Sequence, residues 1–498
     1  MVCSKNRRAA AIAVTLWALV GGLIVVYLVV FAAGAAGRLA RPGDEFTYGE
    51  SWLLDGARRV ARGEGLYAPA DQIPLMHIAY TPLYYCVVGA LQRLFGESGY
   101  TIGRVVSLVA TLVGAGALTW SLRCLTSRWS VGLLAAGLFL TQNLTALLWA
   151  PLHRVDPLAL GLTLVGLALA AAGRVSLAGI AVLLALLTKQ TFVVAPIAVA
   201  IALWPCKAKL IRFGLIVVGG GVVALGMAQW LTGGWFLWHT VTANSNEPDL
   251  LTFAALMGGF LQYNGLPVIA ALIALTLPSN SGERLWRAYF LGALATLPAL
   301  AKLGASSNYW LELSAATAAI LALASYRLAD WPSGRLIAPT VLAGALFIAI
   351  PGYQAGAVEA AATFDELSEP GSPHYLSLIG DGDYGATPLR VDVRFVEMVA
   401  HEPGELLTDN SGLAVAAGKR IEFEFQIFQL LNAEGRWSEQ PILDAVASRR
   451  FALVALMHPL DGPVDGPRWT PALRHALQRD YVAAGEMSGF WLYRPRPS

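Results

Sequence analysis

Long apolar stretches separated by short polar loops occupy the first 351 residues of the chain. A helix needs roughly 17–25 apolar residues to cross a bilayer, so this pattern predicts about eleven membrane-spanning helices. The shorter stretches would tilt or thin the bilayer locally. We place the spans at residues 11–36, 101–122, 131–149, 157–172, 175–188, 191–206, 213–231, 252–277, 288–301, 309–325 and 335–351.

The pattern changes after Pro351, where the chain becomes polar and its apolar runs become short. Ala452–Met457 and Phe490–Tyr493 are typical of strands, and Gln440–Ser448 is typical of a helix with Pro441 in its first turn. Proline and glycine residues at 462–467 predict loops. The chain therefore divides into a membrane domain, 1–351, and a small α/β domain, 352–498, and its fold class is an α-helical polytopic membrane protein with a C-terminal α/β domain.

Basic residues of short loops face the cytoplasm. They fall in alternate loops of the predicted span order, so a single orientation satisfies them all. This orientation puts the N-terminus in the cytoplasm, and both the first outer loop, 37–100, and the C-terminal domain outside. Tyr80–Phe95 is apolar enough to be a short span, but a crossing there would invert every later loop. We therefore interpret it as a juxtamembrane or re-entrant helix.

Composition supports this assignment and narrows the possible functions. Hydrophobic residues make up 56% of the chain and charged residues 14%, whereas soluble proteins carry about 25% charge. All four cysteines lie in the N-terminal half, so no disulfide framework is implied for the outer domain. No metal-ligand spacing, P-loop or Gly-x-Ser-x-Gly nucleophile motif is present in the sequence, and nothing resembles a nucleic-acid-binding surface.

Ionisable residues gather on the predicted outer side. Asp44-Glu45 follows the first span by about ten residues, where a carboxylate could take a proton from a substrate hydroxyl. Cations at helix ends could bind a phosphate and stabilise its developing charge. Ionisable groups at membrane depth are costly and usually functional. The candidates on this side include Asp44, Glu45, His153, Arg154, Asp156, Lys189, His239, Lys302 and Glu312.

Each candidate also has a structural explanation. Asp44-Glu45 could simply mark the exit of a helix, and Arg154 and Lys302 could be snorkelling residues. Asp156 could cap the next helix, with Pro157 at its first position. Lys189 interrupts an apolar run and could lie in a turn between two spans. His239 lies among tryptophans of an interfacial belt.

Four motifs together resemble the GT-C superfamily of membrane glycosyltransferases, which includes protein O-mannosyltransferases and lipid A aminoarabinose transferases. They are Asp44-Glu45, the segment Tyr80-Thr81-Pro82-Leu83-Tyr84-Tyr85 followed by Leu94-Phe95-Gly96 and Gly103-Arg104, Arg154-Val155-Asp156-Pro157, and Leu187-Thr188-Lys189-Gln190-Thr191. The segment from Lys302 to Glu312 is similar to one in uncharacterised bacterial members. The chain departs from the family pattern at Thr81, which replaces a proline, and at Gln190, where glycine is commoner.

The resemblance implies an inverting transfer of a sugar from a polyprenyl-phosphate donor to an acceptor on the outer face of a bacterial plasma membrane. Asp44 would be the general base, and Glu45 would share that role or orient the acceptor. Arg154, Lys189 and Lys302 would bind the donor phosphate. The substrate pocket would include Tyr80, His153, Asp156, Gln190, His239, Asn308 and Glu312.

The identity of the acceptor, whether glycan, lipid or protein, stays open at this point. Some GT-C relatives use a divalent metal and others do not, so a metal cofactor also stays open. Adjacent carboxylates repel, which is expected to raise the pKa of one member of the Asp44-Glu45 pair. The main alternative function is a transporter or flippase for a lipid-linked or small polar substrate. It would place charged or broken-helix features near the bilayer midplane.

Overall fold

The computed structural model describes residues 2–141, 144–245, 247–302, 304–367, 373–377, 389–462 and 469–497. The chain folds into two compact units, each assembled from three separate stretches of sequence. The first comprises Met1–Leu39, Arg104–Leu225 and Asn246–Asp365, and the second comprises Ala40–Gly103, Gly226–Ser245 and Glu366–Ser498. The division predicted from the sequence, by contrast, has one boundary, between residues 351 and 352.

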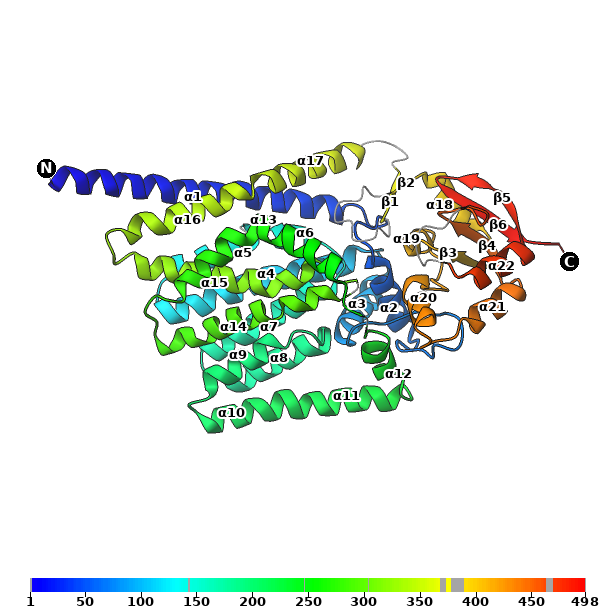
Figure 1. Cartoon of the computed structure of the whole chain (residues 1–498), viewed down its shortest axis with the longest axis horizontal. Helices are drawn as coiled ribbons and strands as arrows, with labels where there is room; N and C mark the ends of the chain where they lie inside the picture. Colours follow the sequence, from blue (N-terminus) through cyan, green and yellow to red (C-terminus); the bar gives the residue numbers. More distant parts are fainter. Residues whose placement is uncertain are drawn as a thin grey trace. The chain divides into compact units, whose positions relative to one another are not determined.

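The first unit is built from helices (Figure 1). They are α1 (Val2–Leu39), α4 (Thr101–Thr126), α5 (Trp129–Thr141), α6 (Leu144–Trp149), α7 (Val155–Ala171), α8 (Val175–Thr188), α9 (Val194–Leu203), α10 (Lys207–Gly214), α11 (Gly220–Leu231), α13 (Leu250–Ala274), α14 (Arg284–Ala295), α15 (Leu311–Leu328), α16 (Gly334–Ile348) and α17 (Ile350–Leu367). A π-helical turn joins α10 to α11, whose residues from Gly226 on belong to the second unit. Two 3-10 turns lie between α14 and α15. One of these turns, Ser307–Trp310, runs directly into α15.

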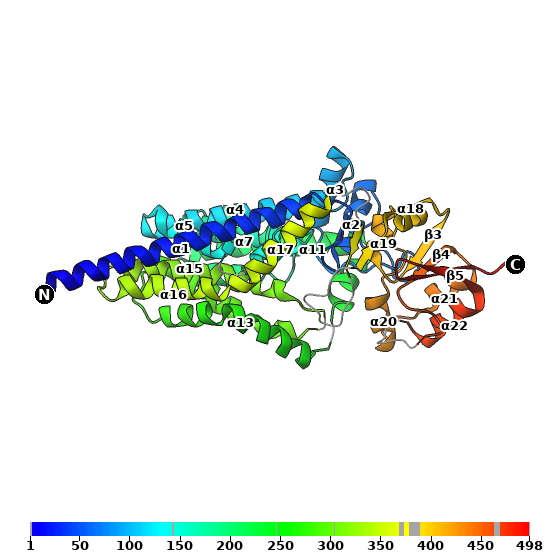
Figure 2. The same ribbon diagram turned by 90° about the horizontal axis from the view of Figure 1, so that it is seen from above.

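Helix α15 lies inside the first unit. It contacts α5, α13, α14 and α16, and most of its side chains are buried. Figures 1 and 2 show it running among these helices. Alanines recur along it, including Ala315, Ala316, Ala318, Ala319 and Ala322. Because lipid tails are as apolar as leucine, helices in a bilayer associate through close packing, and small side chains allow that packing.

Five helical segments are long and apolar enough to cross a membrane, and the bent pair α16 and α17 makes a sixth candidate. The five segments are Arg8–Leu39, Thr101–Thr126, Lys207–Leu231, Leu250–Ala274 and Ser307–Leu328. Four other predicted spans correspond to shorter apolar helices, α5, α7, α8 and α9. The structure thus confirms a membrane protein of apolar helices, while the total of eleven spans stays a prediction.

The last predicted span differs from the structure. We expected it to end at Pro351 and to be followed by a polar region, but α16 ends at Ile348 and the chain continues as α17 to Leu367. The two helices are bent by 46° relative to each other. Pro351 is the second residue of α17, where its missing N–H removes no intrahelical hydrogen bond. The proline therefore begins a helix instead of ending the helical region.

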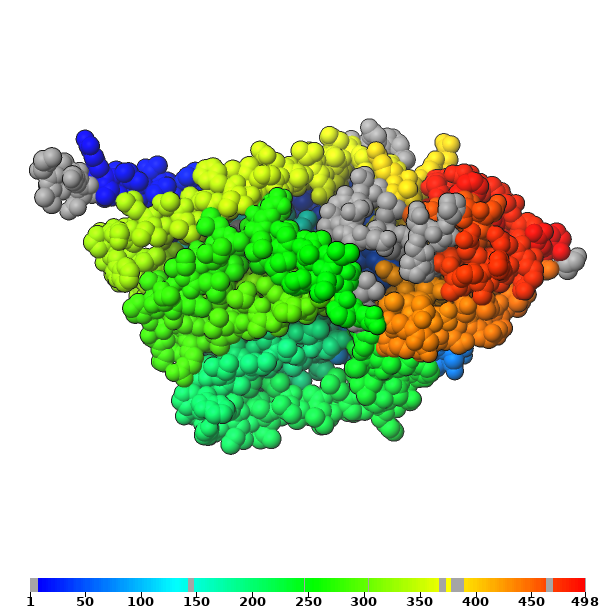
Figure 3. All heavy atoms as spheres, viewed as in Figure 1, coloured from blue at the N-terminus to red at the C-terminus, as the bar shows by residue number. Residues whose placement is uncertain are grey.

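The helical run Lys207–Leu231 exposes its apolar side chains. Leu215, Val218 and Val222 are 69%, 67% and 68% exposed. The space-filling view shows this segment along one edge of the first unit (Figure 3). A large contiguous apolar surface marks an interaction with an apolar environment. In a protein with membrane-spanning helices, we expect this surface to contact lipid.

The second unit contains a four-stranded sheet and a separate two-stranded sheet. The order of the larger sheet is β3-β4-β6-β5, in which β3 and β4 are parallel and the other neighbours are antiparallel. The strands are β1 (His374–Leu376), β2 (Leu389–Val391), β3 (Glu405–Thr408), β4 (Phe451–Leu456), β5 (Tyr481–Met487) and β6 (Phe490–Pro495). The helices are α2 (Glu50–Arg62), α3 (Leu83–Phe95), α12 (Trp235–Leu237), α18 (Val393–His401), α19 (Ser411–Ala416), α20 (Phe425–Ala433), α21 (Gln440–Ala447) and α22 (Pro471–Asp480).

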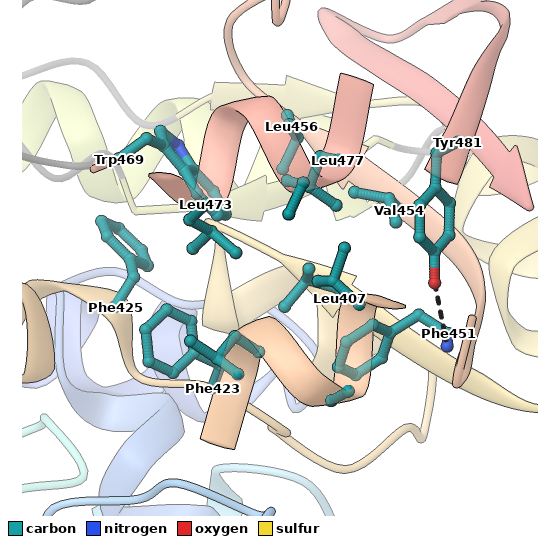
Figure 4. Close-up of a cluster of buried hydrophobic side chains, with 14 of the residues drawn as sticks. Leu407, Phe423, Phe425, Phe451, Val454, Leu456, Trp469, Leu473, Leu477 and Tyr481 are labelled. Atoms are coloured by element: carbon teal, nitrogen blue, oxygen red, sulfur yellow. Dashed lines mark hydrogen bonds between the residues drawn. The ribbon is translucent and has the colours of Figure 1, made fainter. Parts of the chain in front are cut away.

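Buried side chains cover one face of the four-stranded sheet (Figure 4). Leu407 of β3 and Val454 of β4 pack in one cluster with Leu473 and Leu477 of α22. The first residue of β4 is fixed by a polar contact as well, because the backbone N–H of Phe451 donates to the Tyr481 hydroxyl at 3.3 Å. This face therefore forms the main apolar core of the C-terminal stretch.

The opposite face is covered by the first outer loop as well as by C-terminal helices. Leu406 and Leu453 of the sheet share a cluster with Phe395 of α18, Leu413 of α19 and Leu54 of α2. Successive strand residues point to opposite faces, and both faces are covered, which explains why β4 is apolar throughout. The first outer loop therefore belongs to the same hydrophobic core as the C-terminal stretch.

Several local predictions for this unit are confirmed. The two predicted strands are β4 and β6, and the helix predicted at Gln440–Ser448 is α21. Helix α3 occupies most of the ambiguous Tyr80–Phe95 segment and packs on α2. Its interpretation as a juxtamembrane or re-entrant helix stays a prediction, since its 13 residues equal those of α5, a predicted span. Of the predicted loop at 462–467, only Gly462 lies among the described residues.

Candidate active site

Asp44 lies in the first outer loop, five residues after the end of α1, and is almost completely buried. The guanidinium Nη1 of Arg41 donates to its Oδ2 at 2.9 Å, and the imidazole Nδ1 of His374 lies 3.0 Å from its Oδ1. Arg41 also pairs with Glu366 at 2.9 Å and lies over the Tyr375 ring. Buried charges persist only when they are paired, so this network holds the Asp44 carboxylate in one orientation.

Glu45 is also buried, but it has a different set of partners. Its Oε1 accepts from the backbone N–H of Ser51 at 2.9 Å, and its Oε2 accepts from the Ser377 hydroxyl at 2.7 Å. Gly412 of α19 passes so close that a Cβ there would lie 2.6 Å from Oε2. Glu45 thus joins the first outer loop to the C-terminal stretch of the same unit.

One carboxyl of the Asp44-Glu45 pair has a raised pKa, as the sequence predicted, but the cause is different. Burial raises the pKa of Glu45 to about 7, against the lowering effect of the hydrogen bonds from Ser51 and Ser377. The charge that adds to this increase is that of Glu50, rather than that of the neighbouring Asp44. Desolvation thus outweighs carboxylate repulsion.

Glu45 should make the stability of the protein fall as pH rises. Between pH 4.5 and 7 the folded state retains a proton that the unfolded state has lost, so the free energy of unfolding decreases across this window. The full effect is about 3 kcal/mol. Glu45→Gln, which mimics the protonated carboxyl, should remove this decrease when thermal unfolding is measured from pH 4.5 to 7.5. Glu397→Gln, at an exposed position of α18, is the control. Identical pH curves for wild type and Glu45→Gln would contradict the raised pKa of Glu45.

A second polar cluster lies in the first unit around Asp156 of α7, which is fully buried. Its Oδ1 accepts from Lys189 Nζ at 2.5 Å and from Asn308 Nδ2 at 2.8 Å. Lys189 follows α8, and Asn308 lies in the 3-10 turn before α15. Three segments distant in sequence thus converge on one carboxylate, and the structure brings together three of the predicted site residues.

The proposed capping role of Asp156 was wrong. Helix α7 begins at Val155, so its N-cap is Arg154, whose side chain makes no capping hydrogen bond. Asp156 lies inside the first turn of α7, and its carboxylate contacts the Lys189 ammonium in a charge-assisted hydrogen bond. The suggested turn at Lys189 does exist, since α8 ends at Thr188 and α9 starts at Val194.

Two further predicted cations belong to this cluster. The Arg154 guanidinium lies 5.1 Å from the centre of the Trp149 ring and interacts electrostatically with Asp156. Burial, together with the charge of Lys189, lowers the pKa of Lys302 to about 8. Glu312 is buried on α15, where it accepts a hydrogen bond from the Tyr289 hydroxyl at 3.2 Å. The first unit therefore concentrates positive charge around two buried carboxylates.

The remaining predicted pocket residues are divided between the two units. His153 is fully buried before α7, and Gln190 is half-buried beside Lys189. Tyr80 is half-buried in the second unit. His239 is buried there too: its Nδ1 accepts from the Ile78 N–H at 3.2 Å, so Nε2 carries the proton and donates to the Ala68 carbonyl at 2.8 Å. Burial lowers the pKa of His239 to about 4, so it stays neutral while it joins two backbone segments.

Sequence reasoning missed two residues at Asp44. Arg41 could have been found from its spacing, because it precedes the carboxylate by three residues in a tight loop. His374 gives no local signal, since it lies 330 residues away in β1. Within the described part of the chain, no group of three or more His, Cys, Asp or Glu side chains is placed to hold a metal ion. The open metal question therefore gains no candidate ligand set, and no step proposed below uses a metal.

The fold is similar to that of two solved membrane proteins. ArnT from Cupriavidus metallidurans bound to undecaprenyl phosphate superposes with a TM-score of 0.62 at 12% identity, covering 96% of this chain and 99% of ArnT. The Archaeoglobus fulgidus oligosaccharyltransferase in its apo form gives a TM-score of 0.51 at 10% identity, covering 86% of this chain and 69% of that protein. Both neighbours have the GT-C fold.

This chain has the GT-C fold. The resemblance suggested by the short motifs is thereby confirmed at the level of the fold, and the apolar helices confirm an integral membrane protein. No family model matches the chain, and no curated protein matches its sequence. At 12% identity, the likeness to ArnT shows the fold alone.

Proposed function

We propose that this protein transfers a sugar from a polyprenyl-phosphate donor to an acceptor at the outer face of a bacterial plasma membrane, with inversion at the anomeric carbon. The observation that carries the proposal is the buried, oriented Asp44 carboxylate in the first outer loop of a GT-C fold. A fixed carboxylate is the group that an acceptor hydroxyl needs as a base. In the corresponding orientation, the N-terminus is cytoplasmic and the second unit is extracytoplasmic.

Asp44 takes the proton of the acceptor hydroxyl as the acceptor oxygen attacks C1 of the sugar. The bond between C1 and the phosphate oxygen breaks, and its electron pair leaves with the lipid phosphate. A single displacement from the opposite face inverts the configuration at C1. Glu45, whose oxygens are engaged by Ser51 and Ser377, keeps the Asp44 segment in place and is not the base in this scheme.

Arg154, Lys189 and Lys302 supply the positive charge for the departing phosphate. Lys189 is already paired with Asp156, which fixes its ammonium in position before the donor arrives. Preorganised charge stabilises a transition state without a reorganisation cost at the moment of reaction. The donor pocket is proposed to include residues that neighbour these cations in the sequence or in space, namely His153, Gln190, Asn308 and Glu312. Tyr80 is a further candidate.

Sugar transfer in proteoliposomes tests this function. Full-length protein would be incubated with undecaprenyl-phosphate sugars labelled in the sugar, together with an envelope extract as the acceptor source. We expect the label to leave the lipid, undecaprenyl phosphate to accumulate, and the product to have the opposite anomeric configuration by NMR. Lys207→Met on α10 is the control for the loss of a lysine such as Lys189, and it should be as active as wild type.

The same proteoliposomes distinguish the alternative function. A flippase would move the labelled lipid between leaflets and leave the sugar–phosphate bond intact. Intact labelled donor appearing in the opposite leaflet, with no undecaprenyl phosphate formed from any donor, would contradict the transferase proposal. Retention of the anomeric configuration would contradict the single displacement while leaving sugar transfer itself standing.

A further inference from the structure

The contact between His374 and Asp44 is fixed by backbone pairing. One residue further along each segment, the backbone N–H of Glu45 donates to the carbonyl of Tyr375 at 2.8 Å. This hydrogen bond sets the register between the first outer loop and the start of β1, which places His374 opposite Asp44. Both segments belong to the second unit. The backbone therefore holds the His374 imidazole beside the Asp44 carboxylate.

Gly43 has no side chain, and this leaves space for the His374 ring. A Cβ at position 43 would lie 3.0 Å from Cε1 and 3.2 Å from Nδ1 of His374. Those distances are shorter than ordinary van der Waals contacts, so an alanine there would push the ring away by a few tenths of an ångström. Gly43 does not have a positive φ, so alanine is compatible with its backbone. The residue before Asp44 thus offers a way to move His374 without changing its chemistry.

The two partners of Asp44, Arg41 and His374, differ in their exposure to solvent. The side chains of Arg41 and Asp44 are 4% and 5% exposed, whereas that of His374 is 29% exposed. A guanidinium stays protonated in proteins and cannot take up a further proton. An imidazole gains and loses a proton near neutral pH through either ring nitrogen. Of these two partners, His374 is the one that can pass a proton between a buried carboxylate and water.

We propose that His374, supplied by the C-terminal stretch, is the positioning residue that holds Asp44 and removes the proton that Asp44 takes from the acceptor. The inference rests on the proposed function. In the resting site, Nδ1–H of His374 donates to Oδ1 of the Asp44 carboxylate. Once Asp44 has taken the proton of the acceptor oxygen, exchange with water moves the ring proton from Nδ1 to Nε2. Nδ1 then accepts the proton from Oδ1 as Nε2 releases its own to water, which restores the resting Nδ1–H. The acceptor oxygen has meanwhile bonded to C1, and the phosphate has left with the electron pair of its former bond, so charge and atoms balance.

Alanine and asparagine at position 374 separate the two parts of this role. Asparagine can donate a hydrogen bond to Asp44 but cannot carry a proton. We expect His374→Ala and His374→Asn both to lower kcat at least about tenfold, with little change in KM for the donor. Added imidazole should restore activity to His374→Ala, which a merely structural role would not allow. His401→Ala on α18, an exposed histidine of the same unit, should behave as wild type.

Gly43→Ala gives an independent measurement that keeps His374 in the protein. Displacing the ring should lower kcat by a smaller factor than His374→Ala, and imidazole should not restore it. This variant decides the question if His374→Ala does not fold. A kcat for Gly43→Ala equal to that of wild type would then overturn the inference.

The result with Asp44→Asn distinguishes a failure of this inference from a failure of the proposed function. If Asp44→Asn is inactive while His374→Ala retains wild-type kcat, His374 has no role and Asp44 remains the base. If His374→Asn is fully active, His374 does not carry the proton. If Asp44→Asn and His374→Ala are both as active as wild type, the proposed base is wrong and the inference falls with it.

Discussion

Asp44→Asn should lower kcat for sugar transfer by about 10²–10⁴-fold, the range that general-base catalysis contributes. Asparagine has nearly the same shape, and its amide oxygen can still accept a hydrogen bond from either Arg41 or His374. An amide cannot take up the acceptor proton at neutral pH, so the chemical step should fail while the fold persists. The measurement is the initial rate in proteoliposomes at saturating donor, with donor binding followed by competition with undecaprenyl phosphate.

Two matched variants control this experiment. Asp71→Asn makes the same change at an exposed position of the first outer loop and should retain full activity. Glu45→Gln keeps the hydrogen-bonding shape at the neighbouring carboxyl and should retain most of the activity, because Glu45 serves the structure of the loop. If Glu45→Gln were inactive and Asp44→Asn active, the two carboxylates would have to exchange roles.

Breaking the pair between Asp156 and Lys189 should give the largest loss of stability. Both side chains are buried, and removing one partner of a buried pair leaves an uncompensated charge at a cost of about 3–5 kcal/mol. We expect Asp156→Asn and Lys189→Met each to lower the free energy of unfolding by that amount. The double variant should lose much less than the sum of the two, because it leaves neither charge alone. Unfolding in detergent, followed by denaturant or heat, measures all three.

The half-exposed pair of Arg450 and Glu405 is the control for the buried pair of Asp156 and Lys189. Arg450→Met removes the partner of Glu405 on the second unit, where solvent screens the charges, and should cost less than about 1 kcal/mol. Additive losses in the Asp156 and Lys189 double variant would show that the two side chains are not coupled. The double variant has a second use, because a folded protein without the Lys189 charge should also lose transfer if that ammonium serves the donor phosphate.

The two carboxylates of the first outer loop illustrate how far adjacent residues can differ. Asp44 and Glu45 are both buried, yet Asp44 contacts a cation and an imidazole, and Glu45 contacts backbone and hydroxyl donors. Burial raises the pKa of Glu45, whereas the Asp44 carboxylate is held by a guanidinium and an imidazole. The resemblance made Asp44 the general base and left Glu45 to share that role or to orient the acceptor. The different partners of the two carboxyls support the separate roles that the proposed mechanism gives them.

Predictions from local pattern succeeded where one segment carries its own signal. The apolar runs located the long helices, and the short apolar segments located β4 and β6. Lys189 stood out because it interrupts an apolar run, and it lies where a break was expected. The cap predicted at Asp156 was wrong because α7 already begins at Val155. The carboxylate contacts Lys189, which is 33 residues away in the sequence.

The sequence by itself determined that this chain is a membrane protein of apolar helices, and its motifs pointed to the GT-C fold. The length of the apolar runs carries the first of these, since a segment long and apolar enough to cross a bilayer is recognised from its own side chains. Only the tertiary structure decided that His374 lies against Asp44, that Glu45 is desolvated, and that the first outer loop shares a core with the C-terminal stretch. Those contacts depend on which segments pack together, and an apolar face specifies that it will be buried without specifying its partner.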